Sequence, residues 1–343
     1  MPHTHELFMQ RCFQLAQLGL GNVAPNPLVG SIVVHNNKII GEGYHQQYGS
    51  AHAEVNAISS VKDKTLLKDA TLYVNLEPCS HYGKTPPCAD LIVSENIKQV
   101  VICNTDPNPL VAGKGIEKLK AAGIEVINGV LENEGWELNK RFFTFHTKKR
   151  PYIILKWAQS NDGYFTKNNK EQHWITGETA KKIVHQWRSE EQAILAGTQT
   201  VLTDNPELNN RYFASEKQPI RMVIDKDLKI PKHYKVYDNQ IETLIFNKEI
   251  AATKEKTILV KIPFENTLDE ILAELYNRNI QSVIIEGGAT TINKFFLQNL
   301  WDEARILTGT INFKEGIEAP TIKGITIKKN NIGEDQLTII KNK

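Results

Sequence analysis

Apolar residues recur along this chain with two different periods, and these periods predict where helices and strands lie. Between residues 4 and 20 they recur every three or four positions, which predicts a helix ending near Gly19. Two short apolar runs flank Asn36-Asn37 and predict a β-hairpin, because asparagine tolerates positive φ. Further along, predicted strands over 71–76, 99–103 and 124–127 alternate with predicted helices from about 53, from about 87 and over 115–122. This alternation favours a mostly parallel sheet covered by helices on both faces.

The second half of the chain repeats the same pattern after a break. A helix-like stretch over 131–145 leads into the basic run 147–150, which Pro151 ends. We place a domain boundary there, giving domains over 1–146 and 151–343. The strands predicted beyond it cover 152–157, 193–196, 220–224, 243–246, 257–260, 282–285, 304–311 and 336–340, and the helices cover 178–188, 268–277 and 290–299. The pattern therefore predicts two α/β domains.

Composition narrows the class of protein. Of 343 residues, 41% are hydrophobic and 23% are charged, which excludes a mostly disordered chain. The formal net charge of +2 gives no reason to expect a nucleic-acid partner, and no apolar run is long enough to cross a membrane. The four cysteines are too few for a disulfide scaffold, so metal binding or catalysis is the more natural use of any special thiol. We expect a soluble cytoplasmic protein.

A candidate metal site lies in the first domain. His52 and Glu54 open a predicted helix, Cys79 follows a predicted strand, and Cys88 starts another helix. One imidazole and two thiolates suit zinc and leave a fourth position open for water, as hydrolysis requires. Glu54 is then the candidate proton shuttle, provided that an irregular first turn lets it share a site with His52. Alternatively the cysteines are core residues and Glu54 serves the helix dipole, but H-x-E followed by P-C and a further cysteine is typical of zinc-dependent base deaminases.

The spacing of the two cysteines points to one family of deaminases. Eight residues, 80–87, separate them, whereas the usual spacing is two. The string LEPCSHYGKTPPC over 76–88 closely resembles the deaminase domain of the bifunctional riboflavin-biosynthesis deaminase-reductases. The segments 25–27, 43–45 and 106–109 match the same family in the same order, and the resemblance covers both halves of the chain.

For the first domain the resemblance implies a cytidine deaminase-like, three-layer α/β/α fold. The substrate would be a diaminopyrimidinone ribotide that loses an exocyclic amine, with His52, Cys79 and Cys88 holding zinc and Glu54 carrying the proton. The implied substrate-binding residues are Asn26, His45, His81, Lys84, Asp106 and Asn108. His81 and Lys84 suit a phosphate group, while Asn26, His45, Asp106 and Asn108 also fit ordinary turns, an alternative that spacing alone leaves open.

For the second domain the resemblance implies a dihydrofolate reductase-like, three-layer α/β/α fold that uses NADPH to reduce the ribose. By itself, Glu286-Gly287-Gly288 between a strand and a helix favours an ordinary strand-to-helix turn over a phosphate loop. The implied cofactor-binding residues are Ala158, Trp174, Thr200, Asp204, Gly288, Ala289, Thr290, Thr291 and Lys294. The implied substrate-binding residues are Arg188, Leu208, Arg211 and Glu286, with Lys156 near the reacting carbon. Gln172 stands where the family usually has serine.

Two other functions compete with this bifunctional enzyme. A nucleic-acid base deaminase with an RNA-presenting second domain would need a basic, aromatic-rich surface, which the composition does not suggest. A zinc-stabilised binding module would need a fourth protein ligand, for which His45 or His81 are the candidates. We expect small pyrimidine ribotides as partners and a homodimer or higher homo-oligomer through an exposed sheet edge.

Overall fold

The computed structural model describes residues 2–82, 86–109, 111–167 and 174–343, and Lys84 and Gln172 therefore lie outside the described residues. The chain divides into two compact units, Met1–Lys148 (unit 1) and Lys149–Lys343 (unit 2). Among the described residues, no helix has the length and apolar content that a membrane crossing requires.

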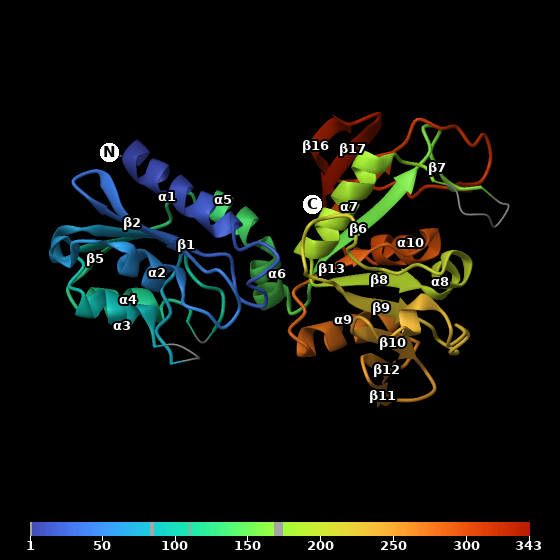
Figure 1. The fold of residues 1–343 in the computed structure, drawn as a ribbon, viewed down its shortest axis with the longest axis horizontal. Helices are drawn as coiled ribbons and strands as arrows, with labels where there is room; N and C mark the ends of the chain where they lie inside the picture. Colours follow the sequence, from blue (N-terminus) through green and yellow to red (C-terminus); the bar gives the residue numbers. More distant parts are fainter. Residues whose placement is uncertain (1, 83–85, 110, 168–173) are drawn as a thin grey trace. The chain divides into compact units, whose positions relative to one another are not determined.

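Unit 1 is built on a five-stranded sheet of order β2-β1-β3-β4-β5. Its strands are β1 (Gly30–His35), β2 (Lys38–Tyr44), β3 (Thr71–Leu76), β4 (Gln99–Asn104) and β5 (Glu125–Asn128). Its helices are α1 (Pro2–Gln17), α2 (Ala53–Ser60), the 3-10 helix η1 (Lys64–Asp69), α3 (Cys88–Ser94), α4 (Lys114–Ala121), α5 (Glu132–Leu138) and α6 (Lys140–Lys148). Strands β3, β4 and β5 are parallel, whereas β1 pairs antiparallel with both β2 and β3, so the sheet is mixed. Helix α1 lies on one face of this sheet, and α2, α3 and α4 lie on the other (Figure 1).

Alternating side chains of the strands of unit 1 form a core on each face of the sheet. Val33, Leu72 and Val100 pack with α2, α3 and α4 on one face. Ile32 and Tyr73 point the other way and pack with α1. This is the period-2 alternation of a sheet covered on both sides, and it gives the predicted three layers.

Unit 2 contains a ten-stranded sheet of order β11-β12-β10-β9-β8-β13-β6-β14-β17-β16. The bounds of its strands are β6 (Tyr152–Gln159), β7 (Tyr164–Thr166), β8 (Ala193–Gly197), β9 (Ile220–Ile224), β10 (Thr243–Asn247), β11 (Ala252–Lys254), β12 (Thr257–Lys261), β13 (Ser282–Ile285), β14 (Glu303–Thr308), β15 (Ile317–Glu318), β16 (Ile325–Ile332) and β17 (Asp335–Lys341). Its helices are α7 (Glu178–Glu190), α8 (Thr198–Asp204), η2 (Lys235–Tyr237), α9 (Thr267–Asn277) and α10 (Ala289–Leu297). In the order of the sheet, the neighbouring strands β12, β10, β9, β8, β13, β6 and β14 are all parallel. Strand β11 pairs antiparallel at one edge, and β17 and β16 pair antiparallel at the other. Strand β7 pairs with β15 in a separate small sheet. Helices α9 and α10 cover one face of the large sheet, and α7 and α8 cover the other.

One predicted helix was wrong in detail, and several short or edge elements were not predicted, β16 among them. The stretch over 131–145 is two helices, α5 and α6, because Asn139 between them binds the backbone of a distant loop. Its side chain accepts a hydrogen bond from the Leu28 amide (2.8 Å) and donates one to the Leu28 carbonyl (2.9 Å). The polar edge strand β16 was not predicted, since most of its side chains are exposed and its sequence lacks an apolar period.

Candidate active sites

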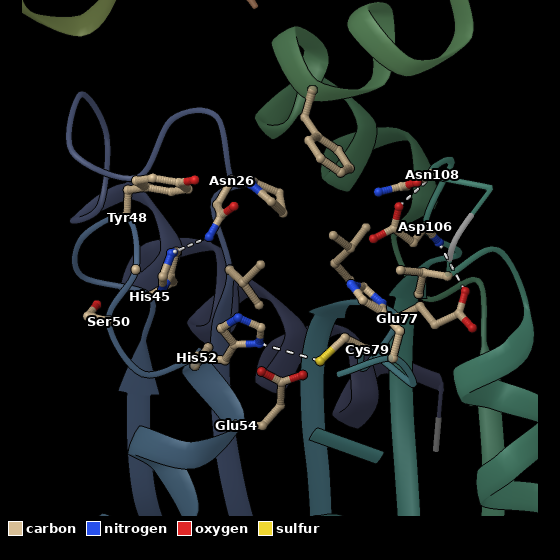
Figure 2. A pocket seen from close by; sticks show the side chains of 18 residues that line it. Asn26, His45, Tyr48, Ser50, His52, Glu54, Glu77, Cys79, Asp106 and Asn108 are labelled. Atoms are coloured by element: carbon tan, nitrogen blue, oxygen red, sulfur yellow. Dashed lines mark hydrogen bonds between the residues drawn. The ribbon is translucent and has the colours of Figure 1, made fainter. Parts of the chain in front are cut away.

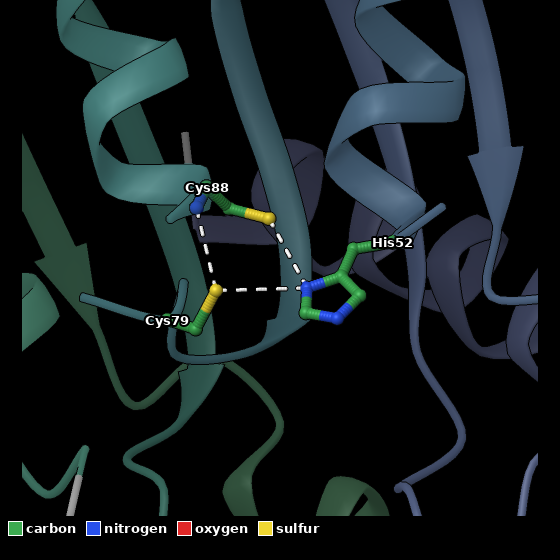
Figure 3. Close-up of side chains that lie close together, drawn as sticks. All are labelled: His52, Cys79 and Cys88. Carbon is green, nitrogen blue, oxygen red and sulfur yellow. Dashed lines mark hydrogen bonds between the residues drawn. The ribbon is translucent and has the colours of Figure 1, made fainter. Parts of the chain in front are cut away.

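Three side chains from separate elements of unit 1 converge on one point (Figure 3). His52 directly precedes α2, Cys79 follows β3, and Cys88 is the first residue of α3. The Nδ1 atom of His52 lies 3.6 Å from the Sγ of Cys79 and 3.3 Å from the Sγ of Cys88. The three donor atoms all lie within 4.8 Å of one another, as the sequence predicted for a metal site.

The spacing of these donors fits a zinc ion. Zinc bonds of about 2.3 Å to sulfur and about 2.0–2.1 Å to nitrogen, at a tetrahedral angle, place nitrogen and sulfur about 3.6 Å apart. The observed separations of 3.6 and 3.3 Å agree with this. Hydrogen bonds from Cys88 and His52 lower the pKa of the Cys79 thiol, which favours a thiolate at this position.

Glu54 shares the site because His52 is not part of the helix. His52 has extended backbone angles (φ −73°, ψ 164°), and α2 begins one residue later. This is the irregular first turn that the two-residue spacing requires. Glu54 is 3% exposed, and burial together with the negative charge of Cys79 raises the pKa of its carboxyl to about 7.

A cavity of about 260 Å³ opens beside this cluster, and His52, Glu54 and Cys79 line it (Figure 2). Asn26 and His45 lie on the cavity wall and bind each other, with the Asn26 amide nitrogen 3.0 Å from His45 Nε2. The other ring nitrogen of His45 lies 3.1 Å from the Ala51 carbonyl oxygen, to which it donates. His45 is therefore a neutral histidine with both nitrogens engaged, and burial lowers its pKa.

The remaining predicted substrate residues of unit 1 also line this cavity where the structure describes them. His81, Asp106 and Asn108 do so, and Lys84 lies outside the described residues. The Asp106 carboxylate accepts a hydrogen bond from the backbone N–H of Asn108 (2.7 Å). Burial raises the pKa of Asp106 to about 7. The sequence thus predicted residues that the fold brings to one cavity from well-separated segments.

A second polar cluster lies in unit 2, where the parallel strands β6, β13 and β8 are neighbours. Arg188 of α7 donates two hydrogen bonds to Glu286, at 2.9 and 2.7 Å, and Lys156 of β6 lies 3.5 Å from the same carboxylate. All three side chains are at most 14% exposed. Burial lowers the pKa of Lys156, and the charge of Arg188 lowers it further. This buried arrangement of two cations and one anion brings together three of the predicted residues.

Two further predicted substrate residues lie on the loop that follows α8. Arg211 donates its backbone amide to His185 Nδ1 (3.1 Å), and its guanidinium lies 4.9 Å from the Tyr212 ring centroid. The side chain of Leu208 is buried in the core between the sheet and α8, so only its backbone is available to a ligand.

His185 is a residue that the sequence reasoning missed. It is 3% exposed and lies one helical turn before Arg188, and its ring packs edge-on against Tyr212. A histidine on an otherwise ordinary amphipathic helix carries no sequence signal that distinguishes it from a surface residue. Its i, i+3 spacing from Arg188 was the available clue.

The predicted cofactor residues lie on several elements of unit 2. Gly288 is the residue before α10 and has no side-chain cap, and its amide donates to Thr200 of α8 (2.7 Å). The uncapped start of α10 leaves backbone amides for a phosphate group, which fits a nucleotide. Trp174 is 66% exposed, with the Lys181 ammonium 5.1 Å from its ring centroid. The other predicted residues are Ala158 at the end of β6, Asp204 at the end of α8, and Ala289, Thr290, Thr291 and Lys294 on α10.

Comparison with known proteins places these sites in context. Residues 2–104 match the family model of the cytidine and deoxycytidylate deaminase zinc-binding region, and residues 151–313 match that of the RibD C-terminal domain. Riboflavin biosynthesis protein RibD of Aquifex aeolicus is 39% identical over 97% of both chains, and that of Bacillus amyloliquefaciens is 44% identical over 87% of this chain and 82% of its own.

Solved structures give the same result. Acinetobacter baumannii RibD superposes with a TM-score of 0.92 at 32% identity and covers 100% of both chains. A Thermotoga maritima protein described as a diaminohydroxyphosphoribosylaminopyrimidine deaminase/5-amino-6-(5-phosphoribosylamino)uracil reductase superposes with a TM-score of 0.90 at 37% identity, covering 100% of this chain and 99% of that one.

Proposed function

This chain belongs to the family of riboflavin biosynthesis protein RibD, and on that premise we propose a role for each of its two units. Unit 1 hydrolyses the exocyclic amine of 2,5-diamino-6-(5-phosphoribosylamino)pyrimidin-4(3H)-one in a zinc-dependent reaction. Unit 2 then reduces the ribose of 5-amino-6-(5-phosphoribosylamino)uracil with NADPH to the ribityl product. The observation that carries the proposal is the convergence of His52, Cys79, Cys88 and Glu54 beside one cavity.

In the deaminase site each residue has a distinct task. Zinc held by His52, Cys79 and Cys88 supplies a Lewis acid that makes water a nucleophile near neutral pH. Glu54 takes the proton of the attacking water and delivers it to the departing amine, so that water and the amine become a carbonyl and ammonia. Asn26, His45, Asp106 and Asn108 hold the pyrimidine and ribose, and His81 and Lys84 hold the phosphate.

In the reductase site the buried cluster of Lys156, Arg188 and Glu286 lies near the reacting ribose. NADPH supplies a hydride to C1′ of the ribose when it is bound. The electrons of the broken C1′–O4′ bond leave with the ring oxygen, which takes a proton from Lys156. The lowered pKa of Lys156 suits a proton donor. Arg188 and Arg211 bind the ribose phosphate, and Glu286 keeps Arg188 in place.

The competing functions find less support. A match of residues 151–313 to the RibD C-terminal domain leaves no RNA-presenting domain for a nucleic-acid deaminase. A closed structural zinc site would need a fourth protein ligand, and the metal-binding cluster among the described residues contains three. Both nitrogens of His45 are already engaged, so His45 does not supply it.

We also propose that the enzyme is cytoplasmic and forms a homodimer or higher homo-oligomer. None of the four cysteines forms a disulfide, as a reducing compartment favours. The edge strand β16 exposes Ile325 and Ile327, so it offers a surface on which a second copy can pair.

Glu54→Gln provides the direct test of the deaminase assignment. The purified variant should bind zinc at the wild-type stoichiometry and release ammonia from the diaminopyrimidine ribotide at least 1,000-fold more slowly, because the amide cannot carry the proton. Its NADPH oxidation with the deaminated ribotide should match wild type. The control is Glu42→Gln, the same chemical change on the surface of unit 1, where Glu42 pairs with Arg11. Ammonia release by Glu54→Gln at the wild-type rate would contradict the assigned role.

A further inference from the structure

A buried carboxylate next to the metal ligands receives an unusual set of hydrogen bonds. Glu77 directly follows β3, two residues before Cys79, and is 4% exposed. Its Oε1 atom accepts from the amides of Gly115 (2.8 Å) and Ile116 (3.2 Å). Its Oε2 atom accepts from the amides of Gly113 (2.9 Å) and Asp106 (3.2 Å), the last of which is drawn in Figure 2. One side chain thus joins three segments of unit 1.

The two hydrogen bonds from the amides of Gly115 and Ile116 replace a missing cap at the start of α4. Gly113, the residue before α4, lies in the left-handed region (φ 82°) and gives no side-chain cap. The first amides of α4 therefore need an acceptor from elsewhere, and Glu77 supplies it. Gly115 permits this approach, because a Cβ there would lie 2.0 Å from the Pro78 carbonyl oxygen. The helix consequently packs directly on the segment that leads to Cys79.

The hydrogen bond from the Asp106 amide connects the Glu77 carboxylate to the loop that carries the proposed substrate-binding residues Asp106 and Asn108. The Asp106 side chain in turn accepts a hydrogen bond from the backbone amide of Asn108 (2.7 Å), and both residues line the cavity on the same side as Cys79 (Figure 2). A shift of the Glu77 carboxylate would therefore move Asp106 and Asn108 relative to the metal ligands. Hydrogen bonds to a buried charge are strong and directional, so the link is stiff.

We propose that Glu77 is a positioning residue of the deaminase, whose carboxylate holds the loop of Asp106 and Asn108 at a fixed place relative to the metal ligands. Glu77 is not one of the three proposed metal ligands, and although it lines the cavity, both of its carboxylate oxygens are engaged by backbone amides. The inference rests on the proposed deamination and identifies the side chain that fixes the position of the Asp106 and Asn108 loop in the deaminase cavity.

Glu77→Gln tests this with an isosteric change. A glutamine amide keeps one acceptor oxygen but turns a donor NH₂ group toward two backbone N–H groups, so one pair of bonds is lost. We expect the KM for the diaminopyrimidine ribotide to rise at least tenfold, with kcat within threefold of wild type and zinc retained. NADPH oxidation by unit 2 on the same chain and the surface variant Glu42→Gln should both be unchanged.

A double-mutant cycle separates positioning from a merely structural role. If Glu77 acts through the side chains of this loop, adding Glu77→Gln to the variant Asp106→Ala/Asn108→Ala should raise KM no further, whereas independent effects would multiply. Glu77→Asp retains the negative charge on a side chain that is one methylene shorter. If Glu77→Gln does not fold, Glu77→Asp is measured in the same assays. An unchanged KM, multiplying effects, or loss of zinc and of the folded unit 1 in both variants would overturn the proposal. If the wild type releases no ammonia from this ribotide, the proposed function itself fails.

Discussion

The ion cluster in unit 2 gives the most quantitative prediction, through the variant Glu286→Gln. Burial alone would raise the pKa of Glu286, but Arg188 and Lys156 lower it from 4.5 to about 2. Since a tenfold change in proton affinity corresponds to about 1.4 kcal/mol, the charged form is stabilised by about 3 kcal/mol. The substitution leaves two buried cations without a counter-charge. Breaking a buried ion pair typically costs about 3–5 kcal/mol, and the value of about 3 kcal/mol from the pKa shift lies at the lower end of this range.

Calorimetry of the full chain measures this cost. For a domain the size of unit 2, a loss of about 3 kcal/mol lowers Tm by roughly 6–12 °C. The transition of unit 2 is identified as the one that NADPH shifts upward. Glu249→Gln is the matched control, because Glu249 is 50% exposed and its nearest lysine nitrogen, on Lys248, lies 3.6 Å away.

The pH dependence gives the sign of the effect. The folded pKa of Glu286 lies below the unfolded value, so its contribution is complete above about pH 4.5 and is lost as the pH falls toward 2. The difference in stability between wild type and Glu286→Gln should shrink over the same interval. A Tm within about 2 °C of wild type at pH 7 would refute the reasoning that Glu286 compensates two buried cations.

Two further predictions follow from other groups. Cys88→Ser, or removal of the metal with a chelator, should abolish zinc binding and ammonia release, while NADPH oxidation with the deaminated ribotide persists; parallel loss of both activities would contradict two independent sites. Burial and the charge of Arg188 lower the pKa of His185 from 6.5 to about 4. The unfolded chain alone then takes up this proton between pH 6.5 and 4, so stability falls as the pH falls, by about 2 kcal/mol at pH 5. His185→Asn should remove that part of the acid sensitivity in urea unfolding, and an unaltered pH profile would contradict it.

Much of the fold could be predicted because burial produces regular apolar patterns. The predicted strands 71–76, 220–224 and 282–285 have the observed bounds of β3, β9 and β13. Each is a largely buried and mostly apolar run that is followed by an acidic residue, Glu77, Asp225 or Glu286. The break at Asn139 could not be predicted, because the Leu28 backbone that causes it lies 111 residues away in sequence.

In the candidate sites, too, some residues could be predicted from the sequence and others could not. The proposed metal ligands His52, Cys79 and Cys88 could be found because their residue types are rare and their spacing is distinctive. Glu77 could not be recognised, since its partners are backbone amides, which any sequence provides, and for His185 the spacing from Arg188 was the only clue. Contacts of this kind, between a side chain and the backbone of a distant segment, become visible only in the structure.

The central claim is that one chain carries two separate sites that act in succession, and a coupled assay tests it most directly. The diaminopyrimidine ribotide is supplied as the sole pyrimidine, and NADPH absorbance is followed for wild type and for Glu54→Gln. We predict that wild type oxidises NADPH after a lag, and that the variant oxidises none until the deaminated ribotide is added, when it proceeds at the wild-type rate. NADPH oxidation by the variant with the undeaminated ribotide, or none with the deaminated one, would contradict the claim.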